Sequence, residues 1–328
     1  MAFFRCFLQT AFHKMKTWLR RSVVPGWALA LLALLAVSCH TPAPAQRDPG
    51  TPTRIALVSD LHVQNPALST NAEVKLYSVR LAKTIEAVNA AQVDCVVIAG
   101  DLTEHGSNWE LGEFRRQTKS FAAPVWFIPG NHDIGNKKIP GKKGAKAEVN
   151  WGRLRDYELE TGRSWWVHEV AGVRLIGLNS ALYGSKMSEE KKMWDFLETE
   201  LGQTNQPATL LVQHHPPFLT NVTEKGGDYF NMEPYPRARL LALARQADVK
   251  AILSGHLHRA LSNSVDGLLL YTTPPVSFSL AKGKRSEGWT LVTVTKDEVK
   301  TEFQPLPKIE PAKPANSAED TPSAKKTP

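Results

Sequence analysis

Cysteine is scarce in this chain, which has three in 328 residues. Cys6 and Cys39 lie near the N-terminus, so the rest of the sequence, with Cys95 alone, cannot form an internal disulfide. Cys95 begins an apolar run, where a single cysteine is usually a small buried hydrophobic residue. No phosphate-binding loop with an arginine follows it, which gives no support to a cysteine nucleophile of the tyrosine-phosphatase type. A cysteine-rich structural zinc site is disfavoured as well.

Basic charge is modest outside the N-terminus. The formal net charge is +8, and residues 1–39 carry five basic residues and no acidic one, which leaves +3 for the remainder. Nucleic-acid binding requires clustered basic charge on one face. The composition therefore predicts no nucleic-acid partner.

The longest apolar run, Trp27 to Val37, is shorter than the roughly 20 apolar residues of a membrane span. Basic residues precede it, as in an export signal, and Ser38-Cys39 at its end resembles the cleavage site of bacterial lipoproteins. We expect an exported protein, either a membrane-anchored lipoprotein with a lipid on Cys39 or a periplasmic or other extracytoplasmic protein. Plain secretion and an uncleaved anchor counted from Val23 remain alternatives, and Met15 could be the true start.

The sequence divides into four predicted parts. Residues 1–39 are the signal peptide or anchor, and residues 40–53, rich in Pro, Ala and Thr, are a flexible linker. Residues 307–328 are expected to be a disordered tail, because they contain almost no large apolar side chain. The folded part is expected at 54–306, as a single domain.

Strands and helices alternate within residues 54–306. Ile55 to Val58 is a continuous apolar run, typical of a strand buried on both faces. Apolar residues at helical spacing predict a helix from Glu73 to Ala91. The pattern indicates an α/β domain with helices outside. It further predicts strands at 94–99, 124–128, 173–178, 209–213, 251–254, 268–271 and within 290–303, and helices at 109–121, 189–201 and 237–246.

Residues that can bind metal follow five of the predicted strands. Ligands of such sheets collect beyond the carboxyl ends of the strands, and glycines before three of the groups allow the backbone to turn tightly. Together the groups offer more ligands than one ion can use, which predicts a site for two divalent ions and favours phosphate ester chemistry. They are Asp60-Leu61-His62, Gly100-Asp101, Gly130-Asn131-His132-Asp133, His214-His215-Pro216-Pro217 and Gly255-His256-Leu257-His258.

This order of motifs resembles the calcineurin-like metallophosphoesterases, over essentially all of residues 54–306. More narrowly, residues 130–136, 178–180, 213–214 and 228–231 resemble the calcineurin-like phosphoesterase domain-containing proteins described as serine/threonine phosphatase-like. Cyclic-nucleotide phosphodiesterases share the first set of motifs. The resemblance implies a four-layer αββα sandwich and hydrolysis of a phosphate ester by metal-bound hydroxide.

The resemblance also implies a role for each matching residue. His132 would contact the substrate and act as the general acid, and Asp133 would orient it. His215 would be a substrate-pocket or packing residue. Seven residues would bind metal: Asp60, His62 and His258 the first ion, Asn131, His214 and His256 the second, and Asp101 both.

Glu104 is an informative departure from one branch of the superfamily. Purple acid phosphatases have a tyrosine three residues after the bridging aspartate, where this chain has Glu104, so a ferric-tyrosinate site is not expected. Carboxylate and imidazole ligands suit Mn, Fe, Zn or Mg. The identity of the two metal ions therefore stays open.

The sequence predicts an enzyme that acts on a phosphorylated small molecule or phosphoprotein. Phosphomonoesters are favoured, and phosphodiesters, including cyclic nucleotides, are the alternative. A non-catalytic metal-binding scaffold is a minority alternative, because His132 and all the expected ligands are present. The sequence does not give the oligomeric state.

Three further features lie close to these motifs in the sequence. Five lysines after residue 136 could form a cationic lip that attracts anions, but a solvated loop is favoured. The tryptophans between the third and fourth predicted strands are expected to pack a long insertion onto the body. Asp228-Tyr229-Phe230 could overhang the site. The lysines are Lys137, Lys138, Lys142, Lys143 and Lys146, and the tryptophans are Trp151, Trp165 and Trp166.

Overall fold

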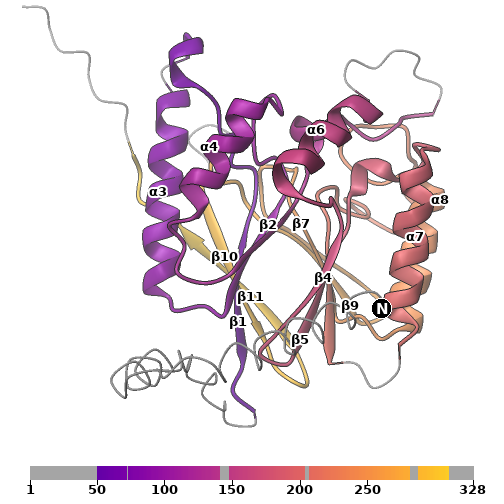
Figure 1. The fold of residues 1–328 in the computed structure, drawn as a ribbon. Helices are drawn as coiled ribbons and strands as arrows, with labels where there is room; N and C mark the ends of the chain where they lie inside the picture. The colour runs from indigo at the N-terminus through magenta and orange to yellow at the C-terminus, as the bar shows by residue number, and fades with distance from the viewer. Residues whose placement is uncertain (1–49, 72, 141–147, 204–206, 281–286, 310–328) are drawn as a thin grey trace, which may run out of the picture. The chain divides into compact units, whose positions relative to one another are not determined.

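The computed structural model describes residues 50–309 apart from 72, 141–147, 204–206 and 281–286. Two β-sheets pack face to face, and helices cover the outer side of each sheet (Figure 1). The predicted αββα sandwich is thereby confirmed. The predicted signal peptide, most of the linker and most of the tail lie outside the described residues, so these domain boundaries stay predictions.

The first sheet has five strands in the order β11-β10-β1-β2-β3. Its first three strands in sequence are parallel, and β10 and β11 add an antiparallel hairpin beside β1. Helices α3 and α4 lie on its outer side (Figure 1). The bounds are β1 Thr53–Val58, α3 Val74–Ala90, β2 Cys95–Ala99, α4 Asn108–Thr118, β3 Val125–Ile128, β10 Gly288–Val294 and β11 Val299–Pro305.

The second sheet has six strands in the order β4-β5-β6-β7-β9-β8. Its four central strands are parallel, and the edge strands β4 and β8 are antiparallel to their neighbours. Helices α7 and α8 lie on its outer side (Figure 1). The bounds are β4 Trp166–Val170, β5 Val173–Gly177, α7 Ser188–Leu201, β6 Ala208–Val212, α8 Pro234–Gln246, β7 Ala251–Ser254, β8 Leu261–Val265 and β9 Leu268–Thr272.

Strand β1 is buried on both faces, as its continuous apolar run predicts. Ile55 and Leu57 pack with the layer between the two sheets, whereas Ala56 and Val58 belong to the larger cluster that includes the helices. Successive side chains of a strand point to opposite faces, so an apolar residue is needed at every position. Cys95 also lies between the sheets, and burial raises the pKa of its thiol to about 12, in agreement with its predicted role as a buried hydrophobic residue.

The sequence did not predict the strands β4 and β8, the helix α6 (Trp151–Thr161) or the short helices α5 (Asn131–Ile134), η1 (Pro66–Leu68) and η2 (Ser180–Leu182). The two edge strands lack a continuous apolar run, because each is only partly buried. The prediction for the tryptophans holds in part. Trp165 is buried and the Trp166 indole donates a hydrogen bond to the Phe127 carbonyl, but Trp151 is 55% exposed, so the packing role predicted for it is wrong.

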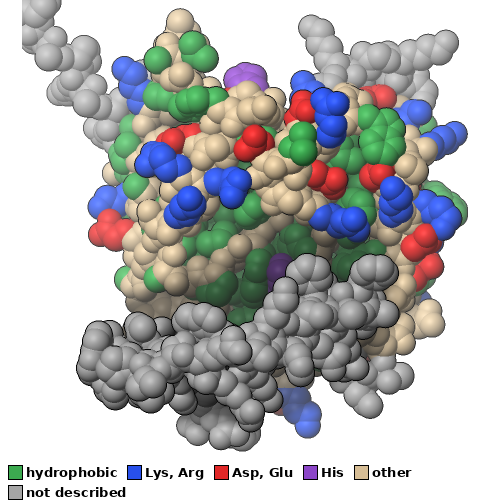
Figure 2. Space-filling view, in the orientation of Figure 1, with side chains coloured by type: hydrophobic (Ala, Val, Ile, Leu, Met, Phe, Trp, Pro, Cys, Tyr) green, Lys and Arg blue, Asp and Glu red, His purple; other side chains and the backbone are tan. Residues whose placement is uncertain are grey.

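The surface carries charges of both signs. Figure 2 shows Lys and Arg side chains interspersed with Asp and Glu on one face of the molecule. Among the described residues, no helix is both long enough and apolar enough to cross a membrane.

Candidate metal centre

The five predicted metal-binding groups follow β1, β2, β3, β6 and β7, whose carboxyl ends meet at one end of the sandwich. Left-handed backbone angles, uncommon in residues other than glycine, occur at five of the seven predicted ligands. Such conformations are strained and collect at functional sites, where the surrounding structure holds them. These residues are Asp60 (φ 54°), His62 (48°), Asp101 (48°), His256 (73°) and His258 (48°).

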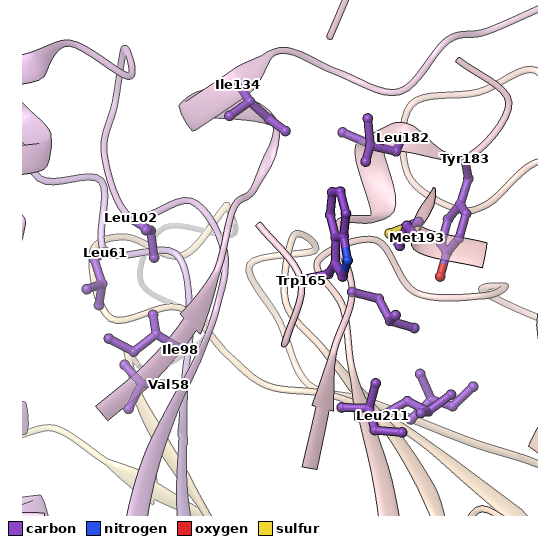
Figure 3. Packing of buried hydrophobic residues seen from close by; sticks show 14 of the residues in the cluster. Val58, Leu61, Ile98, Leu102, Ile134, Trp165, Leu182, Tyr183, Met193 and Leu211 are labelled. Atoms are coloured by element: carbon purple, nitrogen blue, oxygen red, sulfur yellow. The ribbon is translucent and has the colours of Figure 1, made fainter. Parts of the chain in front are cut away.

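Hydrogen bonds and apolar side chains hold these turns in place. The Asp60 amide donates to the Gly100 carbonyl at 3.0 Å, which joins the loop after β1 to the loop after β2. Between the polar groups, Leu61, Leu102 and Ile134 are fully buried. Figure 3 shows Leu61 and Leu102 close together, next to side chains of the two strands. In the loops after β1 and β2, a residue aimed at the site is therefore followed by one buried in the core.

The first donor cluster consists of Asp60, His62, Asp101 and His258, all buried. His62 Nε2 lies 3.2 Å from His258 Nε2 and 3.7 Å from Asp101 Oδ2. His258 Nε2 lies 3.4 Å from Asp60 Oδ1. Two carboxylate oxygens and two ring nitrogens thus converge on one small volume.

The second donor cluster consists of Asp101, Asn131, His214 and His256. Its centre is His214 Nε2, which lies 3.3 Å from Asp101 Oδ2, 3.1 Å from Asn131 Oδ1 and 3.1 Å from His256 Nδ1. Because Asp101 Oδ2 belongs to both clusters, the two sets of donors are adjacent. The structure therefore brings all seven predicted ligands together, around a shared carboxylate.

Each of the four histidines in the donor clusters has one ring nitrogen that points into its cluster and one that points away from it. An oxygen atom lies within hydrogen-bond distance of each nitrogen that points away, here called the outward nitrogen. Since these oxygens accept hydrogen bonds, the outward nitrogens carry protons, and a ring in its neutral form presents a lone pair inward. Facing lone pairs 3.1–3.2 Å apart repel unless a positive charge lies between them. The bonds are His62 Nδ1 to Glu104 Oε2 at 2.7 Å, His214 Nδ1 to the Ala99 carbonyl at 2.8 Å, His256 Nε2 to the Tyr229 carbonyl at 3.0 Å and His258 Nδ1 to the Phe278 carbonyl at 2.6 Å.

The pKa shifts show how strongly the clusters attract positive charge. Burial alone would lower the pKa of His214, but the Asp101 carboxylate outweighs it and raises that pKa to about 9. Burial and the neighbouring His214 lower the pKa of His256 to about 3. The Asp101 carboxylate that raises the pKa of His214 would also attract divalent cations. The donor set fits a dinuclear metal site.

His132 lies beside the first donor cluster without belonging to it. Its ring is 4.6 Å from the ring of His62, and its backbone amide donates to Asp101 Oδ1. Its Nδ1 donates to the Glu104 carbonyl at 2.8 Å, whereas its Nε2 has no hydrogen-bond partner among the described residues. Burial lowers the pKa of His132, but Asp101 and Glu104 raise it more. The free Nε2 could therefore hold a proton at the edge of the site.

The comparisons with known proteins agree with this geometry. The family model for calcineurin-like phosphoesterase matches residues 53–260, more than half of the chain. The chain belongs to the calcineurin-like phosphoesterase family. As a member it is a metal-dependent phosphoesterase. The residue-by-residue roles within the site stay predictions.

Relatives within the family carry different names. A probable glycerophosphodiester phosphodiesterase GpdQ of Arcobacter nitrofigilis is 28% identical over 71% of this chain and 82% of its own length. A serine/threonine-protein phosphatase CPPED1 of Danio rerio is 29% identical over 57% of this chain and 58% of its own length. The crystal structure of a dimetal phosphatase from Danio rerio has a TM-score of 0.55 at 13% identity, covering 79% of this chain and 97% of that one, and supports the fold alone.

Among the described residues, the Asp133 carboxylate makes no hydrogen bond to the His132 ring, and its orienting role stays a prediction. This buried carboxylate accepts hydrogen bonds from the amides of Gly130, Leu102 and Thr103 and from the Thr103 hydroxyl. The hydrogen-bond partner of the His132 ring is instead the Glu104 carbonyl. Burial and the nearby Asp101 raise the pKa of Asp133 to about 6. Asp133 thus ties the loop after β3 to the loop after β2, and its effect on His132 is indirect.

His215, predicted to be a substrate-pocket or packing residue, lies in the interior beside the second donor cluster. It is fully buried, and both ring nitrogens are occupied: Nδ1 pairs with the Ser180 hydroxyl at 2.8 Å and Nε2 with Asn136 Oδ1 at 3.2 Å. Its ring lies 4.4 Å from the ring of His256. This burial and pairing favour the packing alternative, and the role of His215 stays a prediction.

Two residues of the site were not assigned a role from the sequence. The Glu104 carboxylate binds His62 Nδ1 and lies 3.6 Å from His132 Nδ1. The Tyr229 hydroxyl accepts a hydrogen bond from Asn131 Nδ2 at 2.8 Å. For Glu104, the available signal was its position three residues after Asp101. Tyr229 lies within residues 228–230, which were suggested to overhang the site.

Lys137 was expected in a solvated loop and is instead buried, with 1% of its surface exposed. Its ammonium group donates to Glu233 Oε1 at 2.7 Å and to the Asp228 carbonyl at 2.8 Å. Its neighbour Lys138 is exposed, as predicted. Lys142, Lys143 and Lys146 lie outside the described residues.

Proposed function

We propose that this chain hydrolyses phosphomonoesters, with His132 donating the proton that the leaving oxygen requires. The observation that carries the proposal is the pair of donor clusters that share Asp101, with a partly exposed histidine beside them. Two divalent ions bound there would activate both the ester and the attacking water. A histidine with a pKa near neutrality is an effective proton donor.

The chain's own residues would position the reaction. The Glu104 carbonyl fixes the His132 ring through Nδ1, which leaves Nε2 to carry the proton. Asp101 Oδ1 holds the His132 amide, while its Oδ2 is shared by the two donor clusters. One carboxylate thus sets the position of the proton donor relative to both predicted ions.

Phosphodiester hydrolysis is the second candidate. It is supported by the relative named as a probable glycerophosphodiester phosphodiesterase, which this chain matches over most of that protein's length. The monoester is preferred because residues 130–136, 178–180 and 228–231 resemble the phosphatase-like proteins.

Matched substrates decide between the candidates. Turnover of p-nitrophenyl phosphate and bis(p-nitrophenyl) phosphate is measured with the full chain and Mn, for the unaltered protein and for His132→Ala. We expect the monoester to be hydrolysed faster and the variant to lose about 10²–10⁴-fold in rate. A faster diester reaction would favour the second candidate. Binding of metal without turnover of any phosphate ester would indicate a scaffold.

We also propose that the chain is exported and anchored by a lipid on Cys39. Basic residues, an apolar run and small residues before Cys39 support this. Expression in a bacterial host should place the protein in the membrane fraction, and Cys39→Ser should release it. Cys6→Ser is the matched control and should stay in the membrane. An unchanged distribution of Cys39→Ser would refute lipidation at this residue.

A further inference from the structure

The segment after β6 reaches the second donor cluster through Tyr229. The Tyr229 hydroxyl accepts a hydrogen bond from Asn131 Nδ2, and its backbone carbonyl accepts one from His256 Nε2. Its ring lies 4.6 Å from the ring of His256. Two of the predicted ligands of the second ion are therefore in contact with one tyrosine.

A buried ion pair fixes this segment. Lys137 binds both the Glu233 carboxylate and the Asp228 carbonyl, so it holds the segment on either side of Tyr229. The Gly227 amide donates to the same Glu233 carboxylate. Within the segment, the Phe230 amide donates to the Asp228 side chain at 2.8 Å. Residues 228–230 are thus held in one geometry before any substrate arrives.

Two aromatic rings of this fixed segment face solvent. Tyr229 is 37% exposed and Phe230 44% exposed, and their rings pack edge to face with centroids 5.4 Å apart. The Phe230 ring is 6.4 Å from the ring of His256. A single exposed aromatic residue needs no explanation, but an adjacent pair held rigidly against a metal centre offers a preformed surface for another flat ring.

We propose that Tyr229 and Phe230 form an aromatic platform that binds a flat aromatic ring in the organic part of the substrate. This specificity rests on the proposed phosphoesterase function. Stacking is tolerant of the kind of ring, because every aromatic ring presents a π face. The shared chemistry is thus an aromatic phosphate ester, either a nucleoside phosphate or an aryl-bearing phosphate.

Two matched substrate pairs test the platform. Adenosine monophosphate and ribose 5-phosphate share a primary alkoxide leaving group and differ by the base. Benzyl phosphate and cyclohexylmethyl phosphate share a primary alkoxide and differ by the aromaticity of the ring. With the Mn-loaded full chain, the aromatic member of at least one pair should have the higher kcat/KM. The pair that shows the preference identifies the source of the ring.

Phe230→Leu should lower the kcat/KM ratio of the aromatic to the non-aromatic member about 10-fold, because it removes half of the platform. Tyr229→Phe keeps both rings and should retain the ratio. Tyr235→Leu is the matched control, since Tyr235 is 80% exposed in the same part of the chain, and it should also retain the ratio. Equal ratios in Phe230→Leu and the unaltered chain, or no aromatic preference in either pair, would overturn the proposal.

A binding measurement separates this proposal from the proposed function. Calorimetry compares benzylphosphonate and cyclohexylmethylphosphonate, which are not hydrolysed, on the Mn-loaded full chain. Tighter binding of the benzyl compound that Phe230→Leu abolishes supports the platform even if no ester is turned over, in which case the proposed function alone fails. Equal binding of the two compounds overturns the platform even if esters are hydrolysed.

Discussion

Glu104 holds the His62 imidazole through a carboxylate, whereas the other three histidines of the donor clusters are held by backbone carbonyls. A carboxylate partner makes a ligating histidine more basic and fixes its tautomer. It also adds a negative charge close to the first donor cluster. Among these four contacts, only the one to His62 can be changed by substituting the partner's side chain.

Glu104→Gln should therefore weaken metal binding at the first donor cluster. We expect the affinity for Mn to fall about 10-fold, because the amide keeps the size of the side chain and removes its charge. Calorimetric titration of the metal-free chain measures this. Glu113→Gln is the control, since the Glu113 carboxylate accepts hydrogen bonds from Arg116 and Gln117 of its own helix α4. Equal affinities of the two variants would show that Glu104 does not tune the site.

Gly130 shows how closely the loops after β2 and β3 approach each other. A Cβ atom at this position would lie 2.2 Å from the backbone nitrogen of Asp101 and 2.2 Å from its Oδ1. A methyl group cannot fit there, so the loop or the shared carboxylate would have to move. The glycine is required by the close approach of these two loops and not by its own dihedral angles.

Gly130→Ala should consequently disable the centre. We expect a loss of at least about 100-fold in kcat/KM, since small misplacements of catalytic groups have effects of this size. Gly112→Ala in α4 is the control, because a Cβ there meets nothing within 4 Å and alanine favours helix. Steady-state kinetics, with circular dichroism to verify folding, measures both. Full activity of Gly130→Ala would contradict the geometry of this contact.

At the scale of elements, Lys137 and Glu233 connect the segment after α5 (Asn131–Ile134) to the start of α8. Both side chains are at most about one-tenth exposed. Removing one partner of a buried pair leaves the other charge without compensation, which is more damaging than replacing both. We therefore expect that removing one partner destabilises the fold, whereas replacing both partners by apolar residues costs little.

Lys137→Met should lower the free energy of unfolding by about 3 kcal/mol, near the lower end for a broken buried pair because Glu233 keeps some exposure. The double variant Lys137→Met/Glu233→Leu should recover most of this loss. Lys138→Met, at the exposed neighbouring position, should change stability by less than about 0.5 kcal/mol. Urea unfolding measures all three. Equal stability of Lys137→Met and Lys138→Met would mean that the pair is not coupled to folding.

At the scale of the whole molecule, the features predicted from the sequence are those marked by continuous apolar runs or by the order of motifs. The central strands were found because both of their faces are buried, and the seven donors were found because they follow those strands. Strands β4 and β8 were missed because edge strands are only partly buried. The burial of Lys137 and the contacts of Glu104 and Tyr229 depend on loops distant in sequence, whose approach no local pattern encodes.

The two donor clusters also draw side chains from both sheets: Asp60, Asp101 and Asn131 follow strands of the first, and His214, His256 and His258 follow strands of the second. Metal ions bound by these side chains would link the two sheets. They would stabilise the folded state and not the unfolded state, in which the side chains are far apart. A ligand at 100 times its dissociation constant adds about 2.7 kcal/mol of stability. The melting temperature should therefore rise with Mn concentration and fall on addition of a chelator.

Asp101→Asn tests whether this stabilisation comes from the shared carboxylate. The variant should lose most of the Mn-dependent rise in melting temperature, because Asp101 Oδ2 belongs to both clusters. Asp156→Asn, on the surface of α6, should keep the full rise. Differential scanning calorimetry of the full chain, with and without Mn, gives the comparison. If neither Mn nor the chelator changed the melting temperature of the unaltered chain, these side chains would not form a metal site.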